Sequence, residues 1–301
     1  MLRWGRLRVG VCPVMLNLAL ATLLATGCSD TPPRPDEIVQ RFGFERRVQR
    51  GADFTHVVFT NAQTPEPGTL HVYIEGDGTP YVGRHDVAAD PTPRNPLMLR
   101  LMTLDPAPSI YVGRPCYFGL AGGPPCTPRD WTLDRFSPRI VDSMAQVIEQ
   151  TRAARGTDAI ELYGHSGGGA LAVLLAARLD GVQRIVTIGG NLDTDAWAAY
   201  HGYTPLEGSL NPVRAGPLPA SLVQQHFVGH RDKVVPPEIV AAAARRLGAP
   251  GVVVLHDVSH ARGWDRAWPA ILVGEDGVST VGAGSAELVA QPSRRYRNFV
   301  W

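Results

Sequence analysis

The sequence has a single lysine, Lys233, and shows none of the common phosphate, dinucleotide or zinc motifs. It has 29 basic and 28 acidic residues, which leave a formal net charge of +1. Nucleic-acid binding needs a basic face that displaces counterions, so this balance argues against a nucleic-acid partner. There is no G-x-x-x-x-G-K-[ST] loop, no G-x-G-x-x-G after a strand and no H-E-x-x-H. The sequence therefore predicts neither a metal nor a cofactor.

The N-terminus has the layout of a secretory signal peptide. Three arginines in the first eight residues precede a mostly apolar stretch, residues 9–25, and small residues follow it. Residues 25–28 (ATGC) resemble the lipobox of bacterial lipoproteins, which implies cleavage after residue 27 and a lipid-modified Cys28. A stable membrane anchor needs more than one acyl chain, as such a lipid supplies. Ser29 in place of aspartate implies an outer-membrane lipoprotein that faces the periplasm. An ordinary cleaved signal, with a periplasmic or secreted product, and an uncleaved anchor remain alternatives.

The remaining chain divides into a short tether and one domain. Residues 28–45 carry the anchor cysteine and a proline-rich tether, and residues 46–301 form the predicted catalytic domain. Cys116 and Cys126 lie ten residues apart in a Gly/Pro-rich loop, and two such thiols in an oxidising compartment predict a disulfide. A metal site or a catalytic cysteine is the weaker alternative, because further ligands or a neighbouring base are lacking.

Strands and helices alternate from about residue 54. Short apolar runs rich in β-branched residues predict strands over 54–60, 70–76, 109–113, 159–164, 184–190, 225–230 and 252–256. Helical patterns lie between them, after Ser137, over 167–179 and from Pro237 to Gly248. This order predicts an α/β fold with a mostly parallel, doubly wound sheet in three layers. Residues 191–222 are the candidate for a small cap.

One segment of this pattern carries a nucleophile motif. Residues 164–168 (GHSGG) fit G-x-S-x-G, in which small neighbours let a serine project from a sharp strand-to-helix turn. Gly164 and Gly168 supply that space, and the Gly167 N–H at the helix start would face a developing oxyanion. A strand pattern precedes the motif and a helix pattern follows it. A plain tight turn is the alternative in a chain with 32 glycines.

Two later loops complete a resemblance to the α/β-hydrolase family. Residues 229–236 (GHRDKVVP) and 257–260 (DVSH) follow late strands and are similar to that family's acid and histidine loops. The likeness covers roughly residues 54–270. It implies Ser166 as nucleophile, Asp232 as acid and His260 as base, in the chain order that the fold uses.

Other residues compete for these roles. Asp193 and Asp195 are rival acids after the preceding strand, and His230 and His256 are rival bases. His165 is next to the serine, where we expect it to pack or shape the turn and not to act as base.

The second oxyanion donor is expected in the loop after an early strand. By resemblance to the family's His-Gly-x loop, Gly76 permits the bend and the Asp77 backbone N–H points at the oxyanion. Glu75 stands where the family has histidine, which is a departure. The Asp77 carboxylate must then turn away from a forming anion, into hydrogen bonds that fix the loop. A turn rich in Gly and Asp is the plain alternative.

Together these features predict an exported serine hydrolase that cleaves a carboxylic ester through an acyl-enzyme. The modest cap favours small or medium acyl groups. A peptidase, a thioesterase or another cell-envelope acyl hydrolase would use the same triad. A lipid-anchored binding protein on a non-catalytic hydrolase fold is the alternative of another class.

Overall fold

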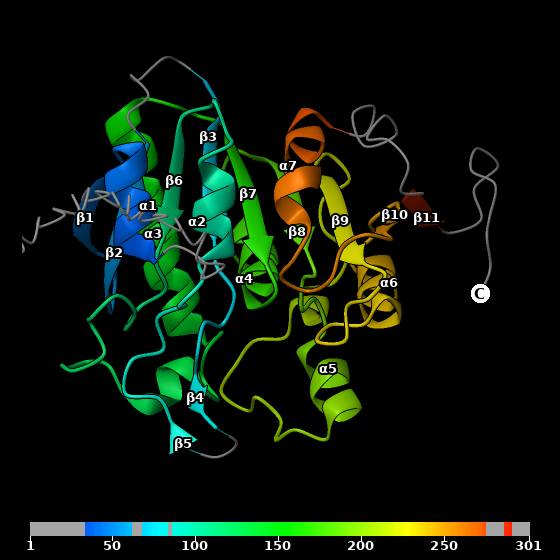
Figure 1. The fold of residues 1–301 in the computed structure, drawn as a ribbon, viewed down its shortest axis with the longest axis horizontal. Helices are drawn as coiled ribbons and strands as arrows, with labels where there is room; N and C mark the ends of the chain where they lie inside the picture. Colours follow the sequence, from blue (N-terminus) through cyan, green and yellow to red (C-terminus); the bar gives the residue numbers. More distant parts are fainter. Residues whose placement is uncertain (1–33, 62–67, 84–85, 275–285, 291–301) are drawn as a thin grey trace, which may run out of the picture. The chain divides into compact units, whose positions relative to one another are not determined.

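The computed structural model describes residues 34–61, 68–83, 86–274 and 286–290, and the predicted signal peptide and Cys28 lie outside them. Their main feature is a nine-stranded sheet with the order β1-β2-β6-β3-β7-β8-β9-β10-β11 (Figure 1). The strands of this sheet are β1 (Glu45–Arg50), β2 (Thr55–Thr60), β3 (Leu70–Ile74), β6 (Ser109–Val112), β7 (Ile160–His165), β8 (Val182–Ile188), β9 (Val223–Gly229), β10 (Gly251–Leu255) and β11 (Ala286–Ala290). A separate small hairpin pairs β4 (Tyr81–Val82) with β5 (Asp86–Val87).

Six central strands run parallel, in the order β6, β3, β7, β8, β9 and β10. Within the described part of this sheet, antiparallel pairing occurs only toward the margins. Successive residues along a central strand pack on opposite faces of the sheet. In β3, Val72 and Ile74 belong to one apolar core and Tyr73 to the other. This two-sided burial is why the strands read as continuous apolar runs in the sequence.

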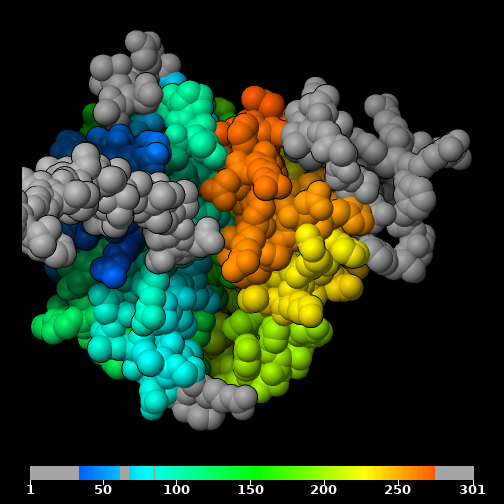
Figure 2. All heavy atoms as spheres, viewed as in Figure 1, coloured from blue at the N-terminus to red at the C-terminus, as the bar shows by residue number. Residues whose placement is uncertain are grey.

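Helices cover both faces of the sheet. One core contains residues of α3 (Pro138–Arg155), α4 (Gly167–Ala176) and α6 (Pro237–Arg246). The other contains residues of α1 (Pro35–Phe42), α2 (Leu97–Met102) and α7 (Trp264–Val273). In Figure 2, the blue-green atoms of α2 and the orange atoms of α7 lie side by side, and an ion pair between Arg100 and Asp265 joins the two helices. The predicted three-layer, mostly parallel α/β fold is thus confirmed.

Part of the predicted tether, residues 28–45, belongs to the fold instead. Pro35 occupies the first turn of α1, where its missing N–H is not needed, and Gly43 ends the helix in the left-handed conformation. Ile38 is buried in the second core. The sequence suggests a tether because the segment is short and rich in proline. The apolar contacts that hold α1 are made with residues far away in the chain, which the local sequence does not show.

The predicted cap is small. Between β8 and β9, a fully described segment, the structure contains α5 (Thr194–His201) and a 3₁₀ turn, Pro212–Ala215. None of the helices in the described part of the chain is long and apolar enough to cross a membrane.

Candidate active site

The nucleophile motif forms a sharp turn between β7 and α4. Ser166 adopts φ 53° and ψ −120°, a conformation that L-residues rarely take. The neighbouring glycines make this turn possible. A methyl group on Gly164 would meet the carbonyl of Gly168, and one on Gly168 would meet the carbonyl of Ile74. The strained serine is therefore held by close backbone packing on both sides.

Asp232 and His260 follow β9 and β10, as the chain order predicts, and they meet. His260 Nδ1 lies 2.8 Å from Asp232 Oδ2. The other carboxylate oxygen accepts the backbone N–H groups of Val234 and Val235, both at 2.9 Å. The Asp232 side chain is fully buried. An acid held at three points orients the imidazole and leaves its Nε2 as the acceptor.

Burial lowers the pKa of His260, the nearby ring of His165 lowers it further, and the bond to Asp232 acts in the opposite direction. A lowered pKa keeps the imidazole neutral, which is the form that can accept a proton.

The structure brings the serine turn to the same place. A methyl group on Gly189 would lie 2.9 Å from Asp232 Oδ2 and 3.2 Å from His260 Nδ1. The preceding residue, Ile188 at the end of β8, accepts the Ser166 N–H at 3.1 Å. Asn191 donates its N–H to the Ser166 carbonyl at 2.9 Å. Within the described residues, Ser166 Oγ and His260 are not joined by a hydrogen bond. Such bonds are often long before a substrate binds and tighten in the complex.

The rival acids have other partners. Asp193 caps α5 by accepting the Ala196 N–H at 3.2 Å, and it also pairs with Arg246 at 2.8 Å. Asp195 pairs with Arg214 at 2.7 Å.

Of the rival bases, His230 and His256 stack on one another with ring centroids 4.8 Å apart. In the described chain, Asp232 is thus the carboxylate that bonds the imidazole of His260.

The Asp77 side chain lies in a buried ion-pair cluster. Its two carboxylate oxygens accept hydrogen bonds from the guanidinium groups of Arg114 and Arg135, and both arginines are almost fully buried. Burial alone would raise the pKa of Asp77, but the charges of Arg135 and Arg114 outweigh it and lower the pKa to about 2. Tyr117 donates its hydroxyl to the Asp77 carbonyl at 2.8 Å. The loop is thus fixed on both its side chain and its backbone.

Two backbone donors remain beside the serine. Across the described residues, the N–H groups of Asp77 and Gly167 donate to no backbone or side-chain acceptor. A methyl group on Gly167 would meet the Asp77 carboxylate, so the two segments are in contact. Two unused N–H groups on adjoining segments next to Ser166 suit an oxyanion hole.

Glu75 was expected to be unfavourable in this loop, because an acid would lie beside a forming anion. Its surroundings direct the carboxylate elsewhere. Its side chain is buried, with Oε1 accepting the Gly76 N–H at 3.1 Å and Oε2 accepting the Met98 N–H at the start of α2 at 2.9 Å. It also faces His165 at 3.5 Å. The carboxylate therefore makes its contacts on the face of the sheet that α2 covers. Sequence reasoning missed these contacts, since no motif links residues 75, 98 and 165.

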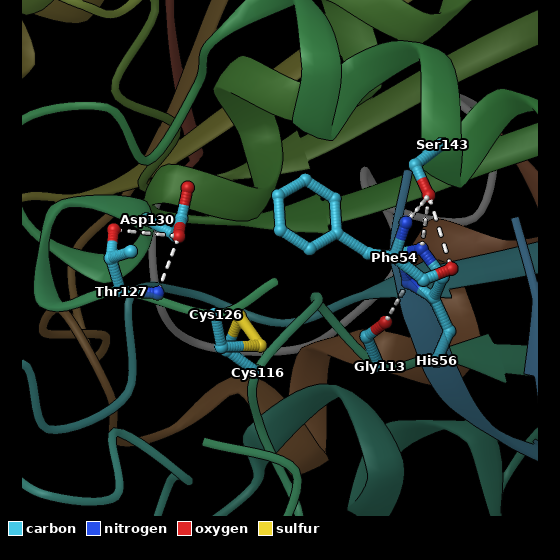
Figure 3. The surroundings of a disulfide bond; sticks show 8 residues. All are labelled: Phe54, His56, Gly113, Cys116, Cys126, Thr127, Asp130 and Ser143. Atoms are coloured by element: carbon cyan, nitrogen blue, oxygen red, sulfur yellow. Dashed lines mark hydrogen bonds between the residues drawn. A yellow bond between two sulfur atoms is a disulfide. The ribbon is translucent and has the colours of Figure 1, made fainter. Parts of the chain in front are cut away.

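The predicted disulfide between Cys116 and Cys126 is present, with Cα atoms 5.7 Å apart (Figure 3). It closes the loop after β6 that carries Tyr117. Hydrogen bonds fix both ends of this loop. His56 Nδ1 lies 2.9 Å from the Gly113 carbonyl before it, and Thr127 donates its N–H to Asp130 at 2.7 Å after it.

In the described chain, no group of three or more His, Cys, Asp or Glu side chains could hold a metal ion.

Solved structures with this fold include several hydrolases. An esterase from Pyrococcus furiosus superposes with a TM-score of 0.54 at 13% identity, covering 82% of this chain and 96% of its own. A serine hydrolase from Xanthomonas campestris, described as lacking a lid, gives 0.50 at 17% identity, covering 78% and 94%. An acylaminoacyl peptidase from Pyrococcus horikoshii gives 0.51 at 12% identity, covering 76% of this chain and 41% of the peptidase.

No protein-family model matches the sequence, and no curated protein is significantly similar to it. The structural likeness at these identities shows the fold alone. The chain has the α/β-hydrolase fold.

Proposed function

We propose that this protein is a serine hydrolase that cleaves a carboxylic ester, with Ser166, His260 and Asp232 as its triad. The observation that carries the proposal is the 2.8 Å bond between His260 and the buried Asp232, formed beside a serine in a strained turn. Structural glycine turns do not need an oriented imidazole next to them, whereas nucleophilic catalysis does.

The reaction follows from these roles. Ser166 Oγ attacks the ester carbonyl carbon while His260 Nε2 takes the hydroxyl proton, and the carbonyl oxygen becomes an anion. Collapse of this intermediate breaks the bond to the alkoxy oxygen, which leaves as an alcohol with the proton from His260. Water then repeats the sequence on the acyl-enzyme, giving a carboxylic acid and free Ser166. Asp232 stabilises the imidazolium in both halves.

The electrostatics beside the serine support this assignment. The N-terminal end of α4 begins at Gly167, and its dipole favours negative charge there. Arg114 and Arg135 share the single carboxylate of Asp77, so that cluster carries one excess positive charge. Both features favour a tetrahedral oxyanion over a neutral carbonyl. Loss of one such donor in other serine hydrolases costs about 2.7–4 kcal/mol of barrier.

The small segment between β8 and β9 bears on the substrate. With only α5 and a 3₁₀ turn, it gives less cover than long acyl chains need, so the expected substrate has a small or medium acyl group. A chain-length series of chromogenic esters, from acetate to laurate, measures this directly. A maximum at the long end would contradict it.

A fluorophosphonate probe tests the central proposal. The wild-type protein should be labelled on Ser166, and Ser166→Ala should not. Ser221→Ala, which changes an exposed serine, is the matched control and should label normally. Absence of labelling in folded wild-type protein would favour a non-catalytic binding protein. Labelling together with hydrolysis of amides or thioesters, but not of esters, would favour the other hydrolases of the same mechanism.

Export and anchoring are part of the proposal. The lipobox-like residues 25–28 support a lipoprotein at the outer membrane, and the disulfide suits an oxidising compartment. Cys28→Ala should release the protein from membranes, and globomycin should block processing of the wild type. Processing that resists globomycin, with a protein found free in the periplasm, would show an ordinary signal peptide.

A further inference from the structure

His165, the last residue of β7, has both ring nitrogens in defined surroundings. Its Nε2 lies 2.9 Å from the backbone carbonyl of His260, and its Nδ1 lies 3.5 Å from Glu75 Oε1. The residue is only 7% exposed and its Nδ1 is fully buried. Apart from Glu75, Nδ1 faces no hydrogen-bonding partner in the described chain.

These contacts limit where the protons can be. A carbonyl oxygen only accepts, so His165 Nε2 must carry a hydrogen. If Nδ1 were bare, its lone pair would be buried and would face a carboxylate oxygen, two acceptors with no proton between them. An unsatisfied buried polar atom is already unfavourable, and a neighbouring carboxylate makes it more so. A proton on Nδ1 changes the same contact into an ion pair.

Glu75 is held in the form that accepts hydrogen bonds. Its two oxygens take the N–H groups of Gly76 and Met98, and such bonds favour an ionised carboxylate. The extra proton therefore belongs on the imidazole. We propose that His165 is a positioning residue, held by Glu75 as a buried imidazolium that fixes the backbone of His260.

The pair links three parts of the site. Glu75 bonds the N–H of Gly76 in the oxyanion loop, His165 is next to the nucleophile, and the His260 carbonyl receives the His165 N–H. Trp264 donates a second N–H to the same carbonyl at 3.0 Å. One carboxylate thus sets the relative positions of the oxyanion loop and the general base, through a histidine that need not touch the substrate.

The charge on His165 also acts on the base. The two imidazole rings have centroids 4.7 Å apart, so a cation at His165 disfavours a second proton on His260. Among the residues that the structure describes, the other titratable or charged groups that act on the pair or on His260 are Asp232, Asp77 with its arginines, and Tyr111. Tyr111 stays neutral, because burial and the charge of Glu75 raise its pKa well above the ordinary value.

The protonation state can be measured without any activity. Full-length protein labelled with ¹⁵N-histidine, observed by long-range ¹H–¹⁵N NMR at pH 8, should show one histidine with protons on both ring nitrogens. An ordinary histidine with a pKa of about 6.5 is only about 3% protonated there. In Glu75→Gln this signal should change to that of a neutral ring protonated on Nε2. A wild-type His165 that is already neutral at pH 8 would overturn the proposal.

The effect on His260 rests on the proposed triad and is tested by pH profiles of kcat/KM on an ester. Glu75→Gln should move the acid limb upward by about half to one pH unit. It removes the carboxylate together with the cation, but the cation at His165 is the one that acts directly on His260. Relative to its plateau, kcat/KM at a pH on that limb should fall about three- to tenfold. An unmoved limb would refute the coupling.

Two controls separate this from general damage. Glu161→Gln removes a different, partly buried carboxylate at the start of β7, which lies 3.7 Å from His71 of β3, and should leave the limb in place. Trp264→Phe removes the uncharged donor to the His260 carbonyl and should lower the rate without moving the limb. If the NMR result holds and no ester is cleaved, the imidazolium stands and the proposed function fails.

Discussion

Replacing Asp77 by asparagine gives the most quantitative expectation. The substitution keeps the size of the side chain and its backbone N–H, but it leaves Arg114 and Arg135 buried without a counterion. The pKa of Asp77 falls from an ordinary value of 3.8 to about 2 in the folded protein. By linkage, this difference stabilises the fold by about 2.4 kcal/mol at pH 7. Breaking a buried ion pair typically costs about 3–5 kcal/mol, so the expected loss is about 2–5 kcal/mol.

The sign of the pH dependence follows from a lowered pKa. The stabilisation is fully present above about pH 4 and is lost as pH falls toward 2, with roughly half of it gone by pH 3. Urea unfolding of wild type and Asp77→Asn at pH 7, 5 and 3 should therefore show a difference that is constant at first and then narrows. Asp142→Asn, which breaks an exposed pair with Arg178, should change stability by less than about 1 kcal/mol. The same difference at pH 7 and pH 3 would refute the reasoning.

Three further outcomes are expected. Asp232→Asn should lower kcat on an ester about 10⁴-fold, because the amide favours the wrong tautomer of the base, and steady-state kinetics showing less than a tenfold loss would contradict the triad. Replacing Cys116 and Cys126 together by serine should lower the free energy of unfolding by about 2–3 kcal/mol in urea titrations, and unchanged stability would show that the loop is held by its other bonds. Burial lowers the pKa of His56 to about 4, which disfavours its protonation in the folded state. Stability should thus fall by about 2 kcal/mol from this residue between pH 7 and pH 5, and His56→Gln should lack that part of the slope.

The parts of the fold that sequence reasoning found are those with local signals. The strands β2, β3 and β6 to β10 are apolar runs, and the helices α3 and α6 begin at prolines that suit a first turn. The turn at Ser166 is a motif flanked by a strand and a helix. The same local reasoning fails for β1, whose sequence ERRVQR is mostly exposed and has no apolar alternation. Its pairing with β2 comes from backbone hydrogen bonds and needs no apolar side.

Other elements were missed because a local rule argued against them. α7 contains Pro269, which normally interrupts a helix, yet Trp264 and Trp268 bury their rings in the core and offset that penalty. α2 has only six residues, although five of them are buried, and a run so short does not show a helical period. In both cases tertiary packing decides a structure that local propensity leaves open.

The candidate site shows the same division. The order of serine, acid and histidine is readable along the chain, because each follows a predicted strand. The ion pairs around the oxyanion loop are not readable, since Asp77 and Arg135 are 58 residues apart and in different elements. A charge partner of this kind becomes visible only when the sheet brings β3 and the segment before α3 together.

Glu75 and Asp77 show why the loop after β3 carries two acids on either side of Gly76. The Glu75 carboxylate meets His165 and α2 on one side of the sheet, and the Asp77 carboxylate meets Arg114 and Arg135 on the other. Because both acids are anchored, the backbone between them beside Ser166 has little freedom to move. An oxyanion hole works only if its donors are already in place when charge develops. If the proposed function holds, the two acids that look unsuited to an anion site are thus the groups that keep its donors in place.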